Sequence, residues 1–533
     1  MNIRKLLTRL VSLALIAVFL PTVAMADTWY LEDGSITVSA TESGQNVSQG
    51  GVTKEDSAPV IRNRDSSAST TNNVTIRADT GATANVTLED TNIDTTGGAG
   101  PKGAGDAAVR TEGAGNVNLN VELDNTLQSG NTHAGVEKGN GGNLTIGSES
   151  GSGQLVATGG DGGAGIGGGE NTGAENITIT GGDIFAIGNG GGAGIGGGWD
   201  CSASDITITG GDIFATGNGG GAGIGGGWYC SASDITITGG NVTAVGKEDN
   251  PNRIGGAGIG GGGSQSSNAG GGSNLKITGG RVTAVGGNFS AGIGGSIGSN
   301  GDNITISNAE VIAIGGTCAA GIGGGCRLGN GIVGQGTNIS ISGSANVKAA
   351  GGVGDSMDGA GAAIGAGGSH QGTTAQEGAA DTSGLSPDGS VERLDPGTTF
   401  DIPQPKPRSS FPKPAPDPVA VEEEPQPVKA ALYRVIDDAG KALPVETKQE
   451  DGVLLLTAQA DIAILEGAIS GLQTLQSRGI DTITFTNGTI SVSFSLAEVI
   501  AKGASSDVYR LTLSGGEANF TLADADITAL LGK

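Results

Sequence analysis

Two acidic residues occupy the same place in consecutive, nearly identical blocks of the sequence. Asp183 and Asp212 each open the segment "DIFA", 29 residues apart. If each block forms one coil of a repeating structure, the two carboxylates lie about 5 Å apart. That separation suits the carboxylate pair of a retaining glycoside hydrolase or a calcium site. The column continues as Asn241, Arg281 and Glu310, the varied polar pattern of an ordinary solvated face.

Aromatic residues recur with the same spacing. Trp199 and Trp228 each follow "GIGGG" in consecutive blocks, and Tyr229 follows Trp228 directly. Aromatic rings beside a polar surface hold sugar rings in many proteins, so these three residues are candidate ligand contacts. The alternative is that the rings only cover the edge of the structure, and the sequence leaves both interpretations open.

The four cysteines form two differently spaced pairs. Cys201 and Cys230 are also 29 residues apart, so they would stack on adjacent coils within disulfide range. We therefore predict a Cys201–Cys230 disulfide, which export from the cell would permit. Cys318 and Cys326 flank "AAGIGGG", and an extended strand would hold them about 26 Å apart, so we expect no bond between them.

The sequence contains few residues that could act as a catalytic histidine or as metal ligands. The chain has two histidines, His133 and His370, both in glycine-rich segments, and no CxxC motif. A Ser-His-Asp triad or a zinc site is therefore not expected. We predict no catalytic residue, no metal site and no cofactor, with calcium the one ion that the stacked carboxylates leave open.

A repeat of about 29 residues must position these side chains. The isoleucine of "AGIGGG" recurs at positions 166, 195, 224, 259, 293, 322 and 364. Each unit holds three extended pieces, such as "NITIT" (176–180), "DIFAIG" (183–188) and "AGIGG" (193–197), which alternate as strands do. Three short strands per unit fit one coil of a parallel β-helix. The expected inner ladders are Ile177, Ile206 and Ile235; Ala186, Ala215, Ala244, Ala284 and Ala313; and Ile195, Ile224 and their copies.

Glycine is the most distinctive part of the composition. It supplies 105 of the 533 residues, whereas aromatic residues make up 3%. We expect glycine at the corners, where positive φ is cheap. In the third strand, Gly165, Gly167 and their copies are predicted to point outward, giving a smooth face that another sheet or a second copy could cover.

The rest of the chain divides by composition. A basic start, the apolar run 10–20 and the small-x-small site 24–26 predict a signal peptide. No later segment is apolar enough to insert in a membrane. The predicted organisation is a signal peptide at 1–26, a cap or irregular first coils at 27–85, the β-helix at 86–370, a low-complexity and Pro-rich linker at 371–429, and a small α+β domain at 430–533.

Within the last domain, "ADIAILEGAISGLQTLQSRG" (460–479) has helical spacing and ends in a glycine suited to a C-cap. Hairpins are expected to turn at Asn487-Gly488 and at Gly515-Gly516. The formal net charge of −26 disfavours nucleic acid as a partner.

The "GGAGIGGG…NITITGG" units, the export signal, the spacer and the "TFTNGTISVSFSLAEVIAKG" tail together resemble secreted bacterial surface proteins with β-helix repeats. The resemblance implies a right-handed, pectate-lyase-like parallel β-helix and a secreted location, peripheral on the bacterial surface. It also implies a non-enzymatic module that binds a polysaccharide or cell-surface ligand. Two alternatives stay open, a polysaccharide lyase or hydrolase and a self-assembling structural component.

Overall fold

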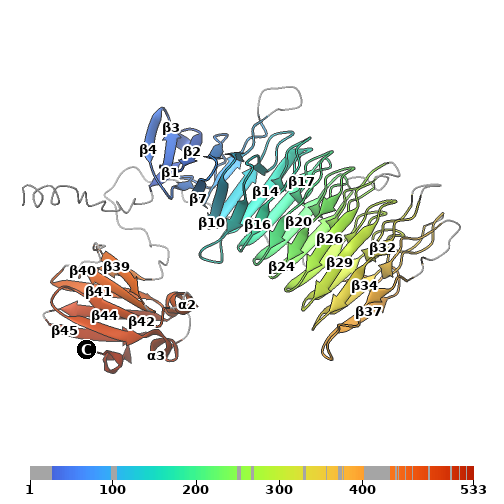
Figure 1. Cartoon of the computed structure of the whole chain (residues 1–533). Helices are drawn as coiled ribbons and strands as arrows, with labels where there is room; N and C mark the ends of the chain where they lie inside the picture. Colours follow the sequence, from blue (N-terminus) through green and yellow to red (C-terminus); the bar gives the residue numbers. More distant parts are fainter. Residues whose placement is uncertain are drawn as a thin grey trace, which may run out of the picture. The chain divides into compact units, whose positions relative to one another are not determined.

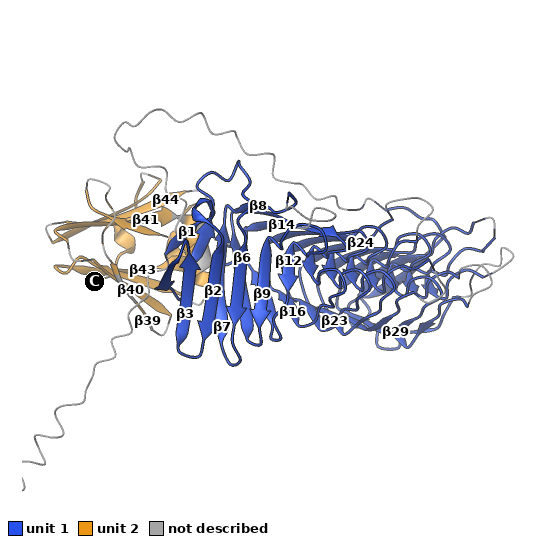
Figure 2. Cartoon of the chain, turned by 90° about the horizontal axis from the view of Figure 1, so that it is seen from above, with its two compact units in different colours: residues 1–414 blue, residues 415–533 orange. Residues whose placement is uncertain are grey.

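The chain forms two compact units, Met1–Pro414 and Ala415–Lys533 (Figure 2). The computed structural model describes residues 27–97, 105–248, 254–265, 269–327, 332–355, 357–369, 375, 377–400, 402, 433–438, 441, 443, 445–450, 452–458, 460–477, 480–503, 507–514, 516–523 and 525–532. The predicted signal peptide, His370 and most of the predicted linker lie outside these residues. No helix among them is both long and apolar enough to cross a bilayer.

Within its described residues, the first unit is built from three long parallel sheets whose strands follow the chain along one axis (Figure 1). The first sheet consists of β1 (Thr28–Tyr30), β5 (Val60–Arg62), β7 (Thr83–Glu89), β10 (Asn116–Glu122), β13 (Leu144–Gly147), β16 (Ile177–Ile179), β19 (Ile206–Ile208), β23 (Ile235–Ile237), β26 (Gly272–Ile277), β29 (Gly301–Ser307), β33 (Ile339–Ser342) and β36 (Ala380–Asp381), with β22 (Ala232–Ser233) and β32 (Gly336–Thr337) beside it.

The second sheet consists of β8 (Asn92–Asp94), β11 (Asp124–Gln128), β14 (Gln154–Asp161), β17 (Asp183–Asn189), β20 (Asp212–Gly217), β24 (Asn241–Gly246), β27 (Arg281–Val285), β30 (Glu310–Ile314), β34 (Asn346–Ala350) and β37 (Ser390–Leu394). The third consists of β4 (Val52–Glu55), β3 (Gly44–Gln49), β2 (Ile36–Thr41), β6 (Val74–Ala78), β9 (Val109–Gly113), β12 (Val136–Lys138), β15 (Ile166–Gly167), β18 (Ile195–Gly196), β21 (Ile224–Gly225), β25 (Ile259–Gly260), β28 (Ile293–Gly294), β31 (Ile322–Gly323) and β35 (Ile364–Gly365).

The interior is made of the ladders that the repeat predicts. In the first sheet Ile177, Ile206 and Ile235 are in-register partners and are buried. In the second sheet the alanines from Ala186 to Ala313 pair coil by coil and are fully buried. A ladder of identical side chains lets every coil pack on its neighbour in the same way, which confirms the expected parallel β-helix.

Asparagine and aspartate mark one corner of each coil. The residue just before the first isoleucine or leucine of the first-sheet strand has a left-handed backbone in successive coils. These corner residues are Asn176, Asp205, Asp234, Asn274, Asn303 and Asn338, with φ between 52° and 59°. Asn and Asp tolerate this conformation better than other residues with a Cβ. The amide nitrogen of Asn274 also donates to Asp234 Oδ1 at 3.1 Å, so the corners are bonded from coil to coil.

The glycines of the third strand are buried inside the coil, so the expected smooth outer face is not present there. Gly165 and Gly167 are both buried. A Cβ on Gly165 would lie 2.3 Å from the backbone nitrogen of Ile187, because the second and third sheets pack backbone against backbone. Gly167 has a φ of 135°, which only glycine adopts readily. Glycine is therefore required by the thin interior of this corner.

Both ends of the first unit depart from the regular coil. At the N-terminal end β2, β3 and β4 pair antiparallel, and the exposed strand β4 carries charged residues that discourage further pairing. At the other end β36 and β37 pair in parallel with β33 and β34. The sheets therefore reach Leu394, and the stretch that we assigned to the linker from residue 371 contributes a further partial coil.

The second unit has a core shared by two sheets and two helices. One sheet contains β38 (Arg434–Ile436), β41 (Ile462–Ala468), β44 (Val508–Ser514), β45 (Glu517–Leu522) and β46 (Ala525–Asp526), and the other contains β39 (Val445–Glu450), β40 (Val453–Ala458), β42 (Thr482–Thr486) and β43 (Ser491–Ser495). The helices are α2 (Ile469–Ser477) and α3 (Leu496–Ile500).

The expected hairpins are present as the antiparallel pairs β42–β43 and β44–β45. The expected helix over 460–479 is only partly correct, because its first half is strand β41. That strand pairs with both β38 and β44, and residues 463–466 are buried in succession. A short apolar run of this kind is compatible with a central strand as well as with a buried helix.

Candidate functional site

A groove of about 630 Å³ is formed by the loops on either side of β15, β18 and β21. We call it the aromatic groove. It is lined by Asn131, Thr132, Asp161, Glu170, Asn189, Gly190, Trp199, Gly219, Trp228, Tyr229 and Gln265. The structure therefore brings the three aromatic residues that the sequence singled out into one site, together with two carboxylates that it did not.

The repeat explains why these side chains meet. The isoleucines of β15, β18 and β21 are in-register partners, so residues at equal offsets from them form columns along the helix axis. The column four residues after each isoleucine is Glu170, Trp199 and Trp228, and the column five residues before it is Asp161, Gly190 and Gly219. The backbone N–H groups of Trp199 and Trp228 donate to Gly162 and Gly191 at 2.8 Å, which ties the loops together.

The three aromatic rings have different exposures. Trp199 and Tyr229 are 39% and 40% exposed, whereas Trp228 is only 6% exposed. A Cβ on Gly220 would lie 2.0 Å from the Trp228 ring, so this indole lies directly on the glycine backbone. Trp228 and Tyr229 meet edge to face, with centroids 5.5 Å apart. Trp199 and Tyr229 can therefore contact a ligand, and Trp228 holds Tyr229 in place.

Tyr229 has an unfavourable backbone conformation. Its φ is 68°, and the residues one and two coils earlier in its column, Asp200 and Asn171, have φ of 61° and 60°. Asp and Asn adopt this region at small cost, but a bulky side chain there is a true outlier. Such strain costs about 1–3 kcal/mol and gathers at functional sites. The backbone conformation at this position therefore favours a small polar residue such as Asp or Asn over a tyrosine.

Two carboxylates belong to the groove although neither was a candidate from the sequence. Asp161 and Glu170 lie on the same coil, five residues before and four residues after Ile166. Asp161 is exposed and Glu170 is half-buried. Asp161 lies one repeat before Gly190, and Glu170 lies one repeat before Trp199. The repeat could therefore have identified both carboxylates from the sequence.

The predicted carboxylate column is formed, but it lies elsewhere. Asp183 and Asp212 are in-register partners at the start of β17 and β20, followed by Asn241 and then by the ion pair of Arg281 with Glu310 at 2.8 Å. Asp183 is half-buried and Asp212 is exposed. Neither residue lines the aromatic groove or the second groove described below.

The predicted Cys201–Cys230 disulfide is wrong, because both residues are free and half-buried thiols. Residues at equal offsets keep their Cβ atoms near the coil spacing of about 4.8 Å, which is wider than the 3.5–4.5 Å of a disulfide. Burial, with the nearby Asp200, raises the pKa of both thiols, and that of Cys230 to about 11.

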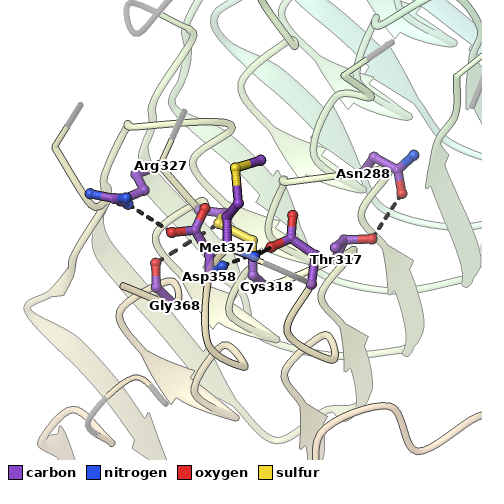
Figure 3. The surroundings of a disulfide bond; sticks show 9 residues. Asn288, Thr317, Cys318, Arg327, Met357, Asp358 and Gly368 are labelled. Carbon is purple, nitrogen blue, oxygen red and sulfur yellow. Dashed lines mark hydrogen bonds and ion pairs between the residues drawn. A yellow bond between two sulfur atoms is a disulfide. The ribbon is translucent and has the colours of Figure 1, made fainter. Parts of the chain in front are cut away.

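The disulfide instead joins Cys318 and Cys326, whose Cα atoms are 5.4 Å apart (Figure 3). We expected no bond because we treated the segment between them as extended. The segment bends sharply, and the N–H of Ala320 donates to the carbonyl of Gly324 at 3.0 Å. The same closure recurs around the two-residue strands of the third sheet, from β15 to β35, as between Ala193 and Gly197.

A buried ion pair lies beside this disulfide. Arg327 Nε donates to Asp358 Oδ1 at 2.8 Å, and both side chains are at most 10% exposed (Figure 3). Cys318, Cys326 and Asp358 are also the one group of potential metal ligands among the described residues. Because the two sulfur atoms are bonded to each other, they offer no thiolate to a metal.

A second groove, of about 600 Å³, has different chemistry. Hydroxyl groups and small residues line most of it, including Thr172, Ser202, Ser231 and Ser273. At one end lies Lys138, which is buried and whose pKa is lowered by that burial. None of the described residues that line it is aromatic, so these residues offer hydrogen bonds without a surface for ring stacking.

Comparison with protein families agrees with this architecture. Five segments match the model of the Beta helix repeat, namely residues 177–199, 206–228, 235–263, 275–298 and 304–326. The chain therefore carries β-helix repeats. The matched units include Trp199, Trp228 and the disulfide of Cys318 with Cys326. Neither the curated proteins nor the solved structures yielded a match.

Proposed function

We propose that this β-helix repeat protein is a non-enzymatic extracellular binding module and that its aromatic groove holds a saccharide. The observation that carries the proposal is the groove itself, in which Trp199 and Tyr229 are each about two-fifths exposed. Aromatic rings of this kind pack against the apolar faces of sugar rings, while amides and carboxylates bond the hydroxyl groups. The cost of the left-handed backbone at Tyr229 is accounted for if its ring serves a ligand.

Binding fits the arrangement better than hydrolysis by the stacked carboxylates. Asp183 and Asp212 lie at the start of β17 and β20 and do not line the groove, so they are not among the groups that surround a saccharide held there. The N-terminal sequence supports an exported protein, peripheral on a bacterial surface. A long, regular solenoid would there present the groove to polysaccharides or to a host surface.

The test is a retention panel of soluble and insoluble polysaccharides, using the chain from residue 27 to its end. Released reducing or unsaturated sugar ends are measured in the same samples. We expect retention of at least one polysaccharide, no released ends, and loss of retention in Trp199→Ala. Ile332→Ala is the matched control, because Ile332 is 71% exposed and does not line the groove.

Two results would overturn the proposal. Released sugar ends would show an enzyme, and Asp183→Asn and Asp212→Asn would then identify whether the stacked carboxylates act. Retention that is unchanged in Trp199→Ala and in Tyr229→Ala would place the binding surface outside the aromatic groove.

A further inference from the structure

We propose that the aromatic groove selects saccharides that carry a protonated amino group. This inference rests on the function proposed above and specifies the ligand of the same site. The juxtaposition that supports it is a pair of carboxylates, Asp161 and Glu170, on the coil next to the exposed ring of Trp199.

The carboxylates lie close to the aromatic rings. A Cβ on Gly190 would be 1.9 Å from Asp161 Oδ1, so this carboxylate covers the backbone of Gly190. The next residue, Gly191, lies between the two indoles, since a Cβ there would be 3.0 Å from Trp228 Cβ and 3.3 Å from Trp199 Cδ1. Carboxylate and rings therefore meet at two consecutive residues of one loop.

The second carboxylate belongs to a side chain that packs beside the backbone of the first. The Cβ and Cγ of Glu170 would both lie 3.2 Å from a Cβ on Gly162, which directly follows Asp161. Glu170 precedes Trp199 in its column, so its carboxylate and the indole are neighbours along the helix axis. Both acidic groups therefore lie beside the surface that a stacked sugar would occupy.

The charge of the groove determines which saccharides fit. Its lining, as far as the described residues form it, contains two carboxylates and no lysine, arginine or histidine. On the preceding coil, Glu137 contacts both His133, at 2.6 Å, and Arg110 of the coil before that, at 2.9 Å, so these two cationic side chains are directed at Glu137. An ammonium group gains charge-assisted hydrogen bonds from the carboxylates and attraction from the ring faces. A uronate would instead be repelled.

The experiment compares two oligosaccharides that differ only in whether their amino groups are free or acetylated. Glucosamine hexamer and N-acetylglucosamine hexamer are titrated calorimetrically into the chain from residue 27 to its end, at low and high salt. We expect the glucosamine hexamer to bind about tenfold tighter or more than the acetylated hexamer at low salt. A factor of this size corresponds to the free energy of one hydrogen bond to a charged group. The preference should shrink at high salt.

Amide variants separate charge from shape. Glu170→Gln and Asp161→Asn should each reduce binding of the glucosamine hexamer and leave that of the acetylated hexamer unchanged. Asn and Gln have the size and shape of Asp and Glu, so these variants remove the charge and keep the shape of the groove. Asp212→Asn is the control, an exposed carboxylate outside the groove, and should change neither affinity.

Failure of the inference differs from failure of the proposed function. If both hexamers bind equally and both lose binding in Trp199→Ala, the proposed saccharide groove stands and the amine preference is overturned. Tighter binding of the acetylated hexamer, or an amine preference that survives both amide variants, would also overturn it. If no saccharide of any class is retained, both proposals fail.

Discussion

Replacing Gly196 by alanine should lower the free energy of unfolding of the β-helix much more than replacing a corner glycine does. Gly196 ends β18 with a φ of 140°, and a Cβ there would lie 2.0 Å from the carbonyl oxygen of Gly225 in the next coil. Non-glycine residues at positive φ cost about 1–3 kcal/mol, and forcing extra atoms into a packed interior costs about another 1–3 kcal/mol.

The expected loss in the free energy of unfolding is therefore about 2–6 kcal/mol. Gly181→Ala is the matched control, because its φ is not positive and its Cβ would meet no atom closer than 3.8 Å. That variant should change stability by about 0.5 kcal/mol or less.

Urea unfolding followed by tryptophan fluorescence measures this difference directly. The three tryptophans of the chain, at positions 29, 199 and 228, all lie in the first unit, so the signal reports the β-helix and not the second unit. Equal midpoints for Gly196→Ala and Gly181→Ala would refute the argument that buried glycines let neighbouring backbones pack together.

Three further predictions follow from single contacts. Ala215→Leu should lower the urea midpoint by overpacking a fully buried position of the alanine ladder, at a cost of about 1–3 kcal/mol. The alkylation rate of Cys230, followed by peptide mass mapping, should reach half of its maximum near pH 11, since burial and Asp200 raise the pKa of the thiol; a midpoint at or below pH 9.0 would contradict this. Tyr509→Phe should slow hydrogen exchange of β44, because it removes a buried hydroxyl that has no hydrogen-bond partner among the described residues, a gain of about 1 kcal/mol; faster exchange would reveal a missed partner.

The repeat length alone predicts which residues stack. Because Ile177, Ala186 and Ile195 each recur at the same offset, their ladders follow from the sequence with the correct register and the correct inward side. Parallel stacking makes each coil repeat the contacts of the one before it. The positions of Asp183 and Asp212 side by side follow for the same reason.

Backbone conformation within a coil could not be predicted in this way. The glycine that ends each short third-sheet strand has a positive φ, as at Gly167 and Gly323, and bends the chain sharply. The bend at Gly323 brings Cys318 to Cys326, and bends of this kind bury the glycines that we expected outside. A pattern of side chains carries no information on φ at a glycine, since glycine adopts both signs readily. The extended geometry that we assumed therefore failed at both places.

The candidate site was predicted in part. Trp199 and Tyr229 are exposed in the groove, whereas Trp228 is buried because Gly220 leaves room for its ring against the backbone. The difference depends on the neighbouring loop and not on the tryptophan itself. Asp161 and Glu170 were missed because the search followed the aromatic residues. In the coil of Ile166, the position of Trp199 and Trp228 is occupied by Glu170, so no aromatic residue drew attention to that coil.

The most direct test of the saccharide groove is hydroxyl-radical footprinting with the polysaccharide that the retention panel identifies. Oxidation of each side chain is read by mass spectrometry, with and without ligand. Trp199 and Tyr229 should become protected, while Met357, which is 60% exposed and outside the groove, should stay equally reactive. Protection confined to another part of the chain, with Trp199 and Tyr229 unchanged, would contradict the account.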